Sequence, residues 1–333
     1  MATVSRALNQ NGLVRAETSR RVNIAVREMK YVPHAGARSL STQRSHTLGV
    51  LLPDVHGEFF SEVIRGIDIA ARQRGYHVLV SGSHSDAAEM SAVLRALRGR
   101  VDGLILMSPD TSLGPISREL GDHTPVVLLN CSAAGRSTIR VDNYSGARSM
   151  TEHLLSLGHR RVAFITGPER NADAAERLRG FRDALRRAEV PDSDVVQIAG
   201  EFTEESGYQA MQQIVAAAKR PTAVFAANDS MAIGSLRGAG EAGLRIPEDV
   251  AIVGFDDIPI ARFLTPPLTT VRVQIAELGR RAVEAVLHDS AQTTGRRRRE
   301  QLIASELVVR ESCGATSSNR TNLSSTNRKS GIN

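Results

Sequence analysis

Asparagine and aspartate follow several apolar segments of this 333-residue sequence: Asn130 follows VVLL, Asn228 follows VFAA and Asp256 follows IVGF. In open parallel α/β sheets, ligands bind beyond the carboxyl ends of the strands, so these residues are the first candidates for a binding site. Each amide or carboxylate can hydrogen-bond to one or two hydroxyl groups, and a set of them predicts a hydroxyl-rich ligand. The alternative for any one of them is an N-cap of the following helix, which we favour for Asp229 and Asp257.

Residue types that support catalysis or hold a metal do not occur at the spacings such sites require. Gly238, Gly240 and Gly243 have the spacing of dinucleotide-binding glycines, but they close a predicted helix, whereas that motif follows a strand and opens a helix. There is no G-x-S-x-G nucleophile motif, and Cys131, Cys313 and the nine histidines match no metal-ligand spacing. We therefore expect no enzymatic activity, no cofactor and no metal.

The net charge of +6 is distributed unevenly along the chain. Residues 1–46 carry +6 and residues 296–333 carry +5, which leaves −5 for the segment between them. A basic N-terminal segment on a mildly acidic body predicts a polyanion partner for the first and a small ligand for the second. The run Arg296–Arg299 has no interleaved aromatic residues and predicts a solvated surface loop.

Composition also indicates the compartment. The sequence has no apolar run of bilayer length, and its N-terminus does not resemble a signal peptide. The two cysteines lie far apart, which suits a reducing environment. We expect a cytoplasmic protein with no membrane partner.

From residue 47 onward, apolar strands alternate with amphipathic helices. Near-continuous apolar strands of this kind predict parallel, doubly wound sheets covered on both faces. Gly75, Gly158 and Gly243 lie where helix C-caps are expected, and Asp86 and Glu89 have the spacing of a capping box. The strands that we expect cover residues 48–52, 77–80, 103–107, 126–129, 162–166, 195–198, 223–226 and 251–254, with a short extended segment at 269–273.

Two short amphipathic helices are predicted before this region, over residues 3–9 and about 17–29. The next segment, residues 34–42, begins after Pro33 and is too short to be a stable helix alone in water. We expect it to become helical only against a charged and grooved partner. The alternative is a flexible linker, which composition alone favours.

A series of motifs then resembles one family, the lactose-repressor (LacI/GalR) family of bacterial transcriptional regulators. The motifs occur in order from the first residues to about residue 312: TVSRALN, YVPHAGARSL, GHRRVAFITGP, RLRGF, PTAVFAANDSMAIG, IPEDVAIVGFDD and TPPLTTV. The segment GEFTEESGYQAMQQI is similar to the purine-repressor branch. The resemblance implies an α/β fold with an N-terminal helix-turn-helix head and a hinge helix, followed by a two-subdomain core like a periplasmic binding protein.

The resemblance also implies which residues contact operator DNA. The first residues match the start of the recognition helix that enters the major groove, and Leu40 matches the leucine that the family inserts into the minor groove. The implied DNA-binding residues are Met1, Ala2, Thr3, Ser5, Arg6, Asn9, Arg38 and Leu40.

For the effector, the resemblance implies a cleft between the two core subdomains. Asn171 and Asp173 occupy positions where a purine-binding site of this family would be expected to have an Arg and a Thr. The resemblance therefore favours a sugar or polyol over a purine as the effector. The implied effector-binding residues are Phe60, Asp142, Asn171, Asp173, Arg177, Phe225, Asn228 and Asp256.

By the same resemblance, the head covers residues 1–33, the hinge helix and linker 34–46, and the core 47–311. The composition of residues 312–333, with almost nothing apolar, predicts a disordered tail. Within the core, the first subdomain covers about 47–143 plus 274–300, and the second about 144–273 plus 301–311. Family members carry one more helix before the recognition helix, so either the start of this sequence is assigned at an internal methionine or the head is truncated. With the head in this form, we expect weak binding to operator DNA with little sequence preference.

The leading hypothesis is a dimeric transcriptional repressor, joined through the first core subdomain and controlled by a small ligand. We expect no tetramer, because the tail lacks a leucine heptad. The alternatives are a ligand-binding protein of the same core fold without DNA binding, and an enzyme of the doubly wound class, for which no catalytic residues were found.

Overall fold

The computed structural model describes residues 4, 7, 14–29, 44–108, 124–133, 135–291 and 299–315. The chain divides into two compact units, residues 1–46 and 47–333. In the first unit, helix α2 covers Ala16–Glu28, close to the predicted 17–29. No residue of α2 is buried, and Met29 just after it is 76% exposed. The apolar residues Val22 and Val26 of α2 are half-buried, and Ala7 of the same unit is buried.

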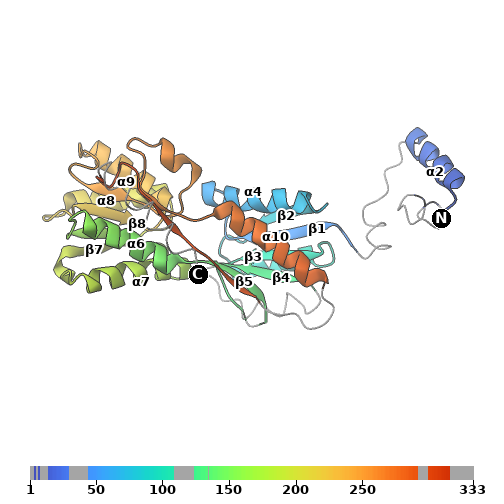
Figure 1. The fold of residues 1–333 in the computed structure, drawn as a ribbon, viewed down its shortest axis with the longest axis horizontal. Coiled ribbons are helices and arrows are strands. Elements are labelled where there is room, and N and C mark those ends of the chain that lie inside the picture. The colour runs from blue at the N-terminus through green and yellow to red at the C-terminus, as the bar shows by residue number, and fades with distance from the viewer. Residues whose placement is uncertain are drawn as a thin grey trace, which may run out of the picture. The chain divides into compact units, whose positions relative to one another are not determined.

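The second unit begins with a six-stranded parallel sheet in the order β11-β5-β4-β3-β1-β2 (Figure 1). Three helices pack on this sheet: α4 (Glu58–Arg72), α5 (Ala87–Leu97) and α10 (Ile275–Ala291). The strands are β1 (Thr47–Leu52), β2 (His77–Gly82), β3 (Gly103–Met107), β4 (Val126–Leu129), β5 (Ser137–Val141) and β11 (Glu300–Ile303).

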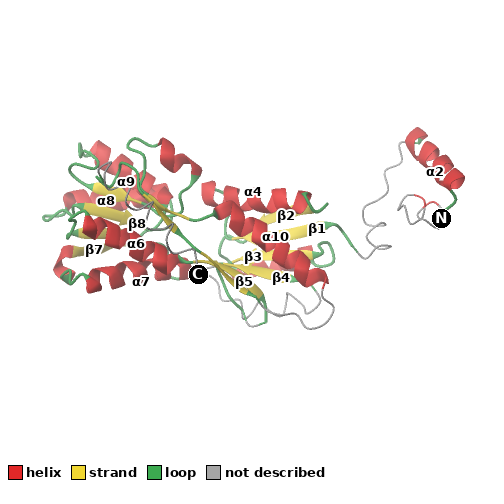
Figure 2. Cartoon of the chain, viewed as in Figure 1, coloured by secondary structure: helices red, strands yellow, loops and turns green. Residues whose placement is uncertain are grey.

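The inner strands of this sheet are buried on both faces, which explains their unbroken apolar sequences. Alternate residues belong to different packing clusters, since side chains point to opposite faces of a strand. Ile105 belongs to the cluster that includes residues of α4 and α10, whereas Leu104 and Leu106 belong to the cluster that includes residues of α5. The predicted parallel sheet with both faces covered is therefore confirmed (Figure 2).

A second parallel sheet of four strands, in the order β7-β6-β8-β9, forms the other half of this unit. Its helices pack in two pairs, α6 with α7 and α8 with α9. The strands are β6 (Val162–Ile165), β7 (Val195–Ile198), β8 (Ala223–Ala226) and β9 (Ala251–Val253), and the helices are α6 (Asn143–Ser156), α7 (Ala172–Arg187), α8 (Glu204–Ala216) and α9 (Asp229–Glu241).

The chain passes between the two halves three times. Two of the connecting segments pair as short antiparallel strands, β10 (Thr270–Arg272) and β12 (Glu306–Val308). The Asp257 carboxylate links these segments, because it accepts hydrogen bonds from Arg272 at 2.7 Å and Arg310 at 2.6 Å. Asp257 is therefore an ion-pair partner, and the helix-capping role favoured from the sequence is wrong.

The last crossing along the chain, between β11 and β12, lies at a different residue from the expected subdomain boundary. Residues 301–311 were assigned to the second subdomain, but β11 pairs with β5 up to Ile303 as the edge strand of the first sheet. The first subdomain thus includes residues up to 303. Strand β5 was absent from the expected strands, because its sequence STIRV is short and partly polar.

Local signals in the sequence correctly predicted several helix ends. Gly75, Gly158 and Gly243 have φ angles of 74°, 92° and 72°, in the left-handed region that glycine adopts without strain. The Asp86 carboxylate accepts hydrogen bonds from the backbone N–H groups of Ala88 and Glu89, as an N-cap. In the described part of the chain, no helix is long and apolar enough to cross a membrane.

Candidate functional site

A cleft between the two halves of the second unit encloses about 700 Å³, including space open to solvent. It lies beyond the carboxyl ends of the strands, as expected for open parallel sheets. The N-terminal ends of α4, α7 and α9 contribute much of its lining. The lining residues are His56, Gly57, Glu58, Phe59, Phe60, Met107, Asn130, Asn171, Asp173, Arg177, Phe202, Asn228, Ser230, Asp256 and Ile258.

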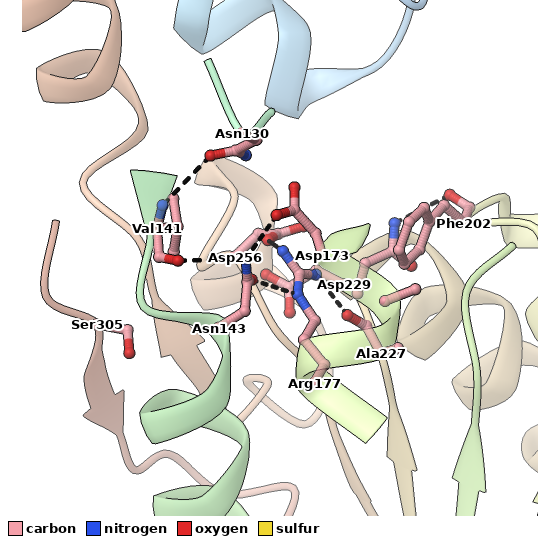
Figure 3. Close-up of polar contacts among 12 residues, drawn as sticks. Asn130, Val141, Asn143, Asp173, Arg177, Phe202, Ala227, Asp229, Asp256 and Ser305 are labelled. Atoms are coloured by element: carbon pink, nitrogen blue, oxygen red, sulfur yellow. Dashed lines mark hydrogen bonds and ion pairs between the residues drawn. The ribbon is translucent and has the colours of Figure 1, made fainter. Parts of the chain in front are cut away.

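Arg177 of α7 is the central cation of this cleft, and its side chain is only 5% exposed. Nε donates to Asn143 Oδ1 at 2.8 Å, Nη1 to the Ala227 carbonyl at 2.6 Å, and Nη2 to Asp256 Oδ1 at 3.0 Å (Figure 3). The guanidinium carbon lies 3.9 Å from the centroid of the Phe255 ring. These contacts fix the guanidinium, because a planar group held in three directions and stacked on a ring cannot rotate.

Asp256 is held by its backbone as well as by Arg177. Its φ of 115° is unusual for a residue other than glycine. Its N–H donates to the Val271 carbonyl at 2.8 Å, and its carbonyl accepts from the N–H of Val273 at 3.2 Å. Asp256 therefore joins the cleft to the connecting segment that contains β10.

Asp173 supplies a second carboxylate in the first turn of α7. Asn143 links Asp173 to Arg177, since its Nδ2 donates to Asp173 Oδ1 at 2.8 Å while its Oδ1 accepts from Arg177 Nε at 2.8 Å. Asp173 keeps partial exposure, whereas Asp256 is 4% exposed. Asp173 is thus the carboxylate that is more accessible to a ligand.

Burial dominates the electrostatics of the acidic groups. It raises the pKa of both Asp173 and Asp256 to about 6, although the nearby Arg177 guanidinium opposes the rise. Burial beside the Asp256 charge raises the pKa of Asp229 well above its usual range. Asp229 accepts hydrogen bonds from Thr270 Oγ1 at 2.6 Å and the Ile258 N–H at 2.9 Å, while Asn228 caps α9, so the capping role favoured for Asp229 is wrong.

The two asparagines at the helix starts combine capping with exposure to the cleft. Asn171 Oδ1 accepts from the N–H of Ala174 at 3.0 Å, and Asn228 Oδ1 accepts from the N–H of Met231 at 3.0 Å. Asn228 Nδ2 also donates to the carbonyl of Phe202 at 3.0 Å. Both side chains are therefore oriented by the protein itself.

The first half of the unit provides the apolar wall. Phe59 and Phe60 meet edge to face, with their ring centroids 5.5 Å apart. Beside them, Glu58 Oε2 accepts a hydrogen bond from the N–H of Ile260 at 3.0 Å, which joins the two halves at the cleft. An apolar wall facing polar groups is an arrangement typical of sites for small polar ligands.

The structure brings six of the eight predicted effector residues into the cleft: Phe60, Asn171, Asp173, Arg177, Asn228 and Asp256. Phe225 does not line it, because the ring is fully buried in the core against Phe164 and Phe181. Asp142 does not line it either, because its carboxylate caps α6 by accepting from the Ser145 N–H at 3.0 Å. The predicted DNA-binding residues lie outside the described residues.

Several lining residues were not predicted as effector-binding residues. Phe202 and Ser230 occupy a loop and a helix start, where no periodic pattern distinguishes a ligand contact from a solvated position. Glu58 is the first residue of α4, where an acidic residue is common because it favours the positive helix end, so its type did not indicate a ligand contact. No group of three or more His, Cys, Asp or Glu side chains among the described residues could hold a metal ion.

We expect Asp173→Asn to stabilise the ligand-free core at pH 7.5 by up to about 3 kcal/mol, since a pKa raised from 3.8 to about 6 corresponds to that free energy. The folded protein holds this proton more tightly than the unfolded chain does. The cost of ionising Asp173 is therefore absent below about pH 4, develops between about pH 4 and 6, and is constant above that range. Urea unfolding of both proteins between pH 4.5 and 8 measures the difference, and a difference that does not grow with pH would contradict the expectation.

Two family models match the sequence: bacterial regulatory proteins of the lacI family over residues 1–34, and the periplasmic binding protein-like domain over 151–313. The ribose operon repressor of Escherichia coli strain K12 is 36% identical over 307 residues, which cover 90% of this chain and 92% of that protein. A solved lac repressor dimer bound to operator and the anti-inducer ONPF is 30% identical, with a TM-score of 0.85, covering 94% of this chain and 95% of that one. A LacI family regulator from Enterococcus faecium with bound ribose is also 30% identical, with a TM-score of 0.73, covering 80% of this chain and 98% of that one.

Proposed function

The chain belongs to the LacI family of bacterial regulatory proteins, and we propose that it is a cytoplasmic transcriptional repressor whose affinity for operator DNA is controlled by a sugar or polyol bound in the cleft. The proposal of a sugar or polyol ligand rests on the buried hydrogen-bond network of Arg177, Asn143 and Asp256 beside Asp173. Groups fixed in this way present donors and acceptors at set positions, which is how proteins select hydroxyl-rich ligands. The ribose named for one relative and one structural neighbour supports the same class.

We place operator contact in the N-terminal segment, at the residues that the family resemblance indicates, with Leu40 and Arg38 in the hinge. Residues 1–46 carry a net charge of +6, which suits a phosphate backbone. The match of the lacI family model to residues 1–34 disfavours the alternative of a ligand-binding protein without DNA function. The working form in this proposal is a homodimer, joined through the first core subdomain.

We propose that the cleft binds its ligand without chemical turnover, as the relatives are transcriptional repressors. Asp256 is engaged by Arg177, and Asp173 by Asn143, so the cleft carboxylates act as oriented acceptors. A ligand recovered unchanged from the saturated protein supports this proposal. Conversion of the ligand by wild type that is lost in cleft variants would contradict it.

Binding to operator DNA is expected to weaken at least tenfold when the salt concentration doubles from 100 to 200 mM. About four phosphate contacts suffice for this dependence, because each contact releases condensed counterions from the DNA. Fluorescence anisotropy with labelled operator measures the slope of affinity against salt. Affinity that does not respond to salt would contradict a phosphate-binding head, and a core fragment from residue 47 onward serves as the control without the basic segment.

A further inference from the structure

We propose that the cleft selects an uncharged ligand over its phosphorylated form, and that Asp173 is the main residue that determines this selection. The inference rests on the proposed sugar-binding function and deepens it. Sugars and sugar phosphates share their hydroxyl groups, so hydrogen bonding to hydroxyls does not separate the two classes. The charges around the cleft can distinguish a sugar from its phosphate ester.

Three helices begin at the cleft, and such ends ordinarily attract anions because their N–H groups and dipoles point outward. Two of these helices have an acidic residue in the first turn that also lines the cleft, Glu58 in α4 and Asp173 in α7. A carboxylate at this position offsets the positive helix end. The starts of α4 and α7 therefore do not favour a phosphate.

Side-chain caps reinforce this effect on two of the helices. Asn171 occupies the N–H of Ala174 in α7, and Asn228 occupies the N–H of Met231 in α9. The start of α4 has no side-chain cap, but Glu58 lies there and lines the cleft. A phosphate would thus find one N–H already capped at α7 and one at α9, and a carboxylate at the starts of α4 and α7.

Arg177 does not supply the missing positive charge. Three of its N–H directions are taken by Asn143, Ala227 and Asp256, and the Asp256 carboxylate balances its charge at 3.0 Å. The lining residues include three carboxylates and one guanidinium, whose formal charges sum to −2. An entering phosphate dianion would be repelled in a partly buried site, where charges interact more strongly than in water.

Asp173 is the carboxylate best placed to act on the ligand. Asp256 is neutralised by its ion pair, and Glu58 is engaged with the Ile260 N–H, whereas Asp173 is held by the neutral amide of Asn143. Asp173 keeps partial exposure and lines the cleft, and Figure 3 shows it between Asn130 and Arg177. Among the described residues Asp173 forms no direct ion pair, so its carboxylate can act on an entering ligand.

The test compares neutral and phosphorylated forms of the same sugars by calorimetry on the full chain. The probes are D-ribose with D-ribose 5-phosphate, and D-glucose with D-glucose 6-phosphate. We expect at least one neutral sugar to bind, and its phosphate ester to bind at least tenfold more weakly. An ester that binds as tightly as its parent, or more tightly, would overturn the inference while leaving a sugar effector in place.

The variants then assign the selection to Asp173. Asp173→Asn keeps the shape of the side chain and removes its charge, so the preference for the neutral sugar should fall about tenfold relative to wild type. Glu176→Gln makes the same charge change on the same helix, at a residue that pairs with Arg179 and does not line the cleft, and should leave the preference unchanged.

Circular dichroism melting curves confirm that both variants are folded before calorimetry. A preference that is unchanged in Asp173→Asn would refute the role of Asp173, because exclusion by size alone does not depend on this charge. Folded wild type that binds no sugar of either form would overturn the proposed sugar effector itself, and with it this inference.

Discussion

Arg177→Ala is expected to lower effector affinity at least a hundredfold and to destabilise the core by about 3–5 kcal/mol, since it removes one partner of a buried ion pair. The substitution leaves Asp256 as a buried carboxylate without its cation, and it leaves the Ala227 carbonyl without its donor. It also opens space against Phe255, which packs on the guanidinium at 3.9 Å. All of these changes destabilise the ligand-free protein. The loss of the Arg177 guanidinium also removes the group that orients the Asp256 carboxylate toward a ligand.

Arg179→Ala is the matched control for this prediction. Arg179 lies two residues further along α7, with a side chain that is 56% exposed and paired with Glu176. Its removal should change stability by less than about 1 kcal/mol, because exposed ion pairs contribute little. Urea unfolding and calorimetry with the effector found by screening measure both variants.

Arg177→Lys covers the case in which the alanine variant does not fold. Lysine keeps the positive charge but cannot reproduce the planar fork that reaches Asn143, Ala227 and Asp256 together. We expect this variant to fold and to bind the effector at least tenfold more weakly than wild type. Wild-type affinity in a folded lysine variant would show that Arg177 does not organise the site.

Much of the core could be predicted from sequence because its signals are local. A strand buried on both faces needs an unbroken apolar run, and β3, β4, β6 and β8 each have one. Helix ends at Gly75, Gly158 and Gly243 follow from the left-handed backbone that glycine tolerates. Strand β5, with its partly polar sequence, lacked that signal and was missed.

The site was harder to predict because it depends on which face a side chain occupies. Phe225 lies in a strand with every residue buried, so its sequence gives no indication whether the ring faces the cleft or the core. Asp142 and Asn143 are neighbours, yet Asp142 caps α6 while Asn143 joins Arg177 and Asp173. Arg177 itself was identified through a resemblance to known motifs, and periodicity alone would have placed it on a solvated helix face.

Gly234→Ala is expected to destabilise the core by about 3 kcal/mol or more, because it forces apart two helices whose backbones are in contact. A Cβ atom at Gly234 would lie 1.8 Å from the Glu204 carbonyl oxygen and 2.7 Å from the Tyr208 nitrogen. These are backbone atoms of α8, so no side-chain rotation relieves the clash. A Cβ atom at Gly207 of α8 would likewise lie 2.1 Å from the Met231 carbonyl oxygen of α9, so the crossing requires glycine on both helices.

The effect of Gly234→Ala should reach the cleft as well as the core. Separation of α8 from α9 would shift the start of α9, where Asn228 lines the cleft and binds the Phe202 carbonyl. We therefore expect weaker effector binding at a temperature where the variant is still folded. Unchanged affinity there would mean that the helix crossing supports stability alone.

Gly240→Ala on the same helix separates this clash from the general effect of alanine. A Cβ atom at Gly240 would have no neighbour within 4 Å, and alanine favours helical backbone over glycine by about 1 kcal/mol. The same chemical change six residues apart should therefore raise the melting temperature at Gly240 and lower it at Gly234. Thermal unfolding of the two variants measures both signs, and a fall at both positions would show that loss of glycine flexibility, rather than contact between α8 and α9, limits stability.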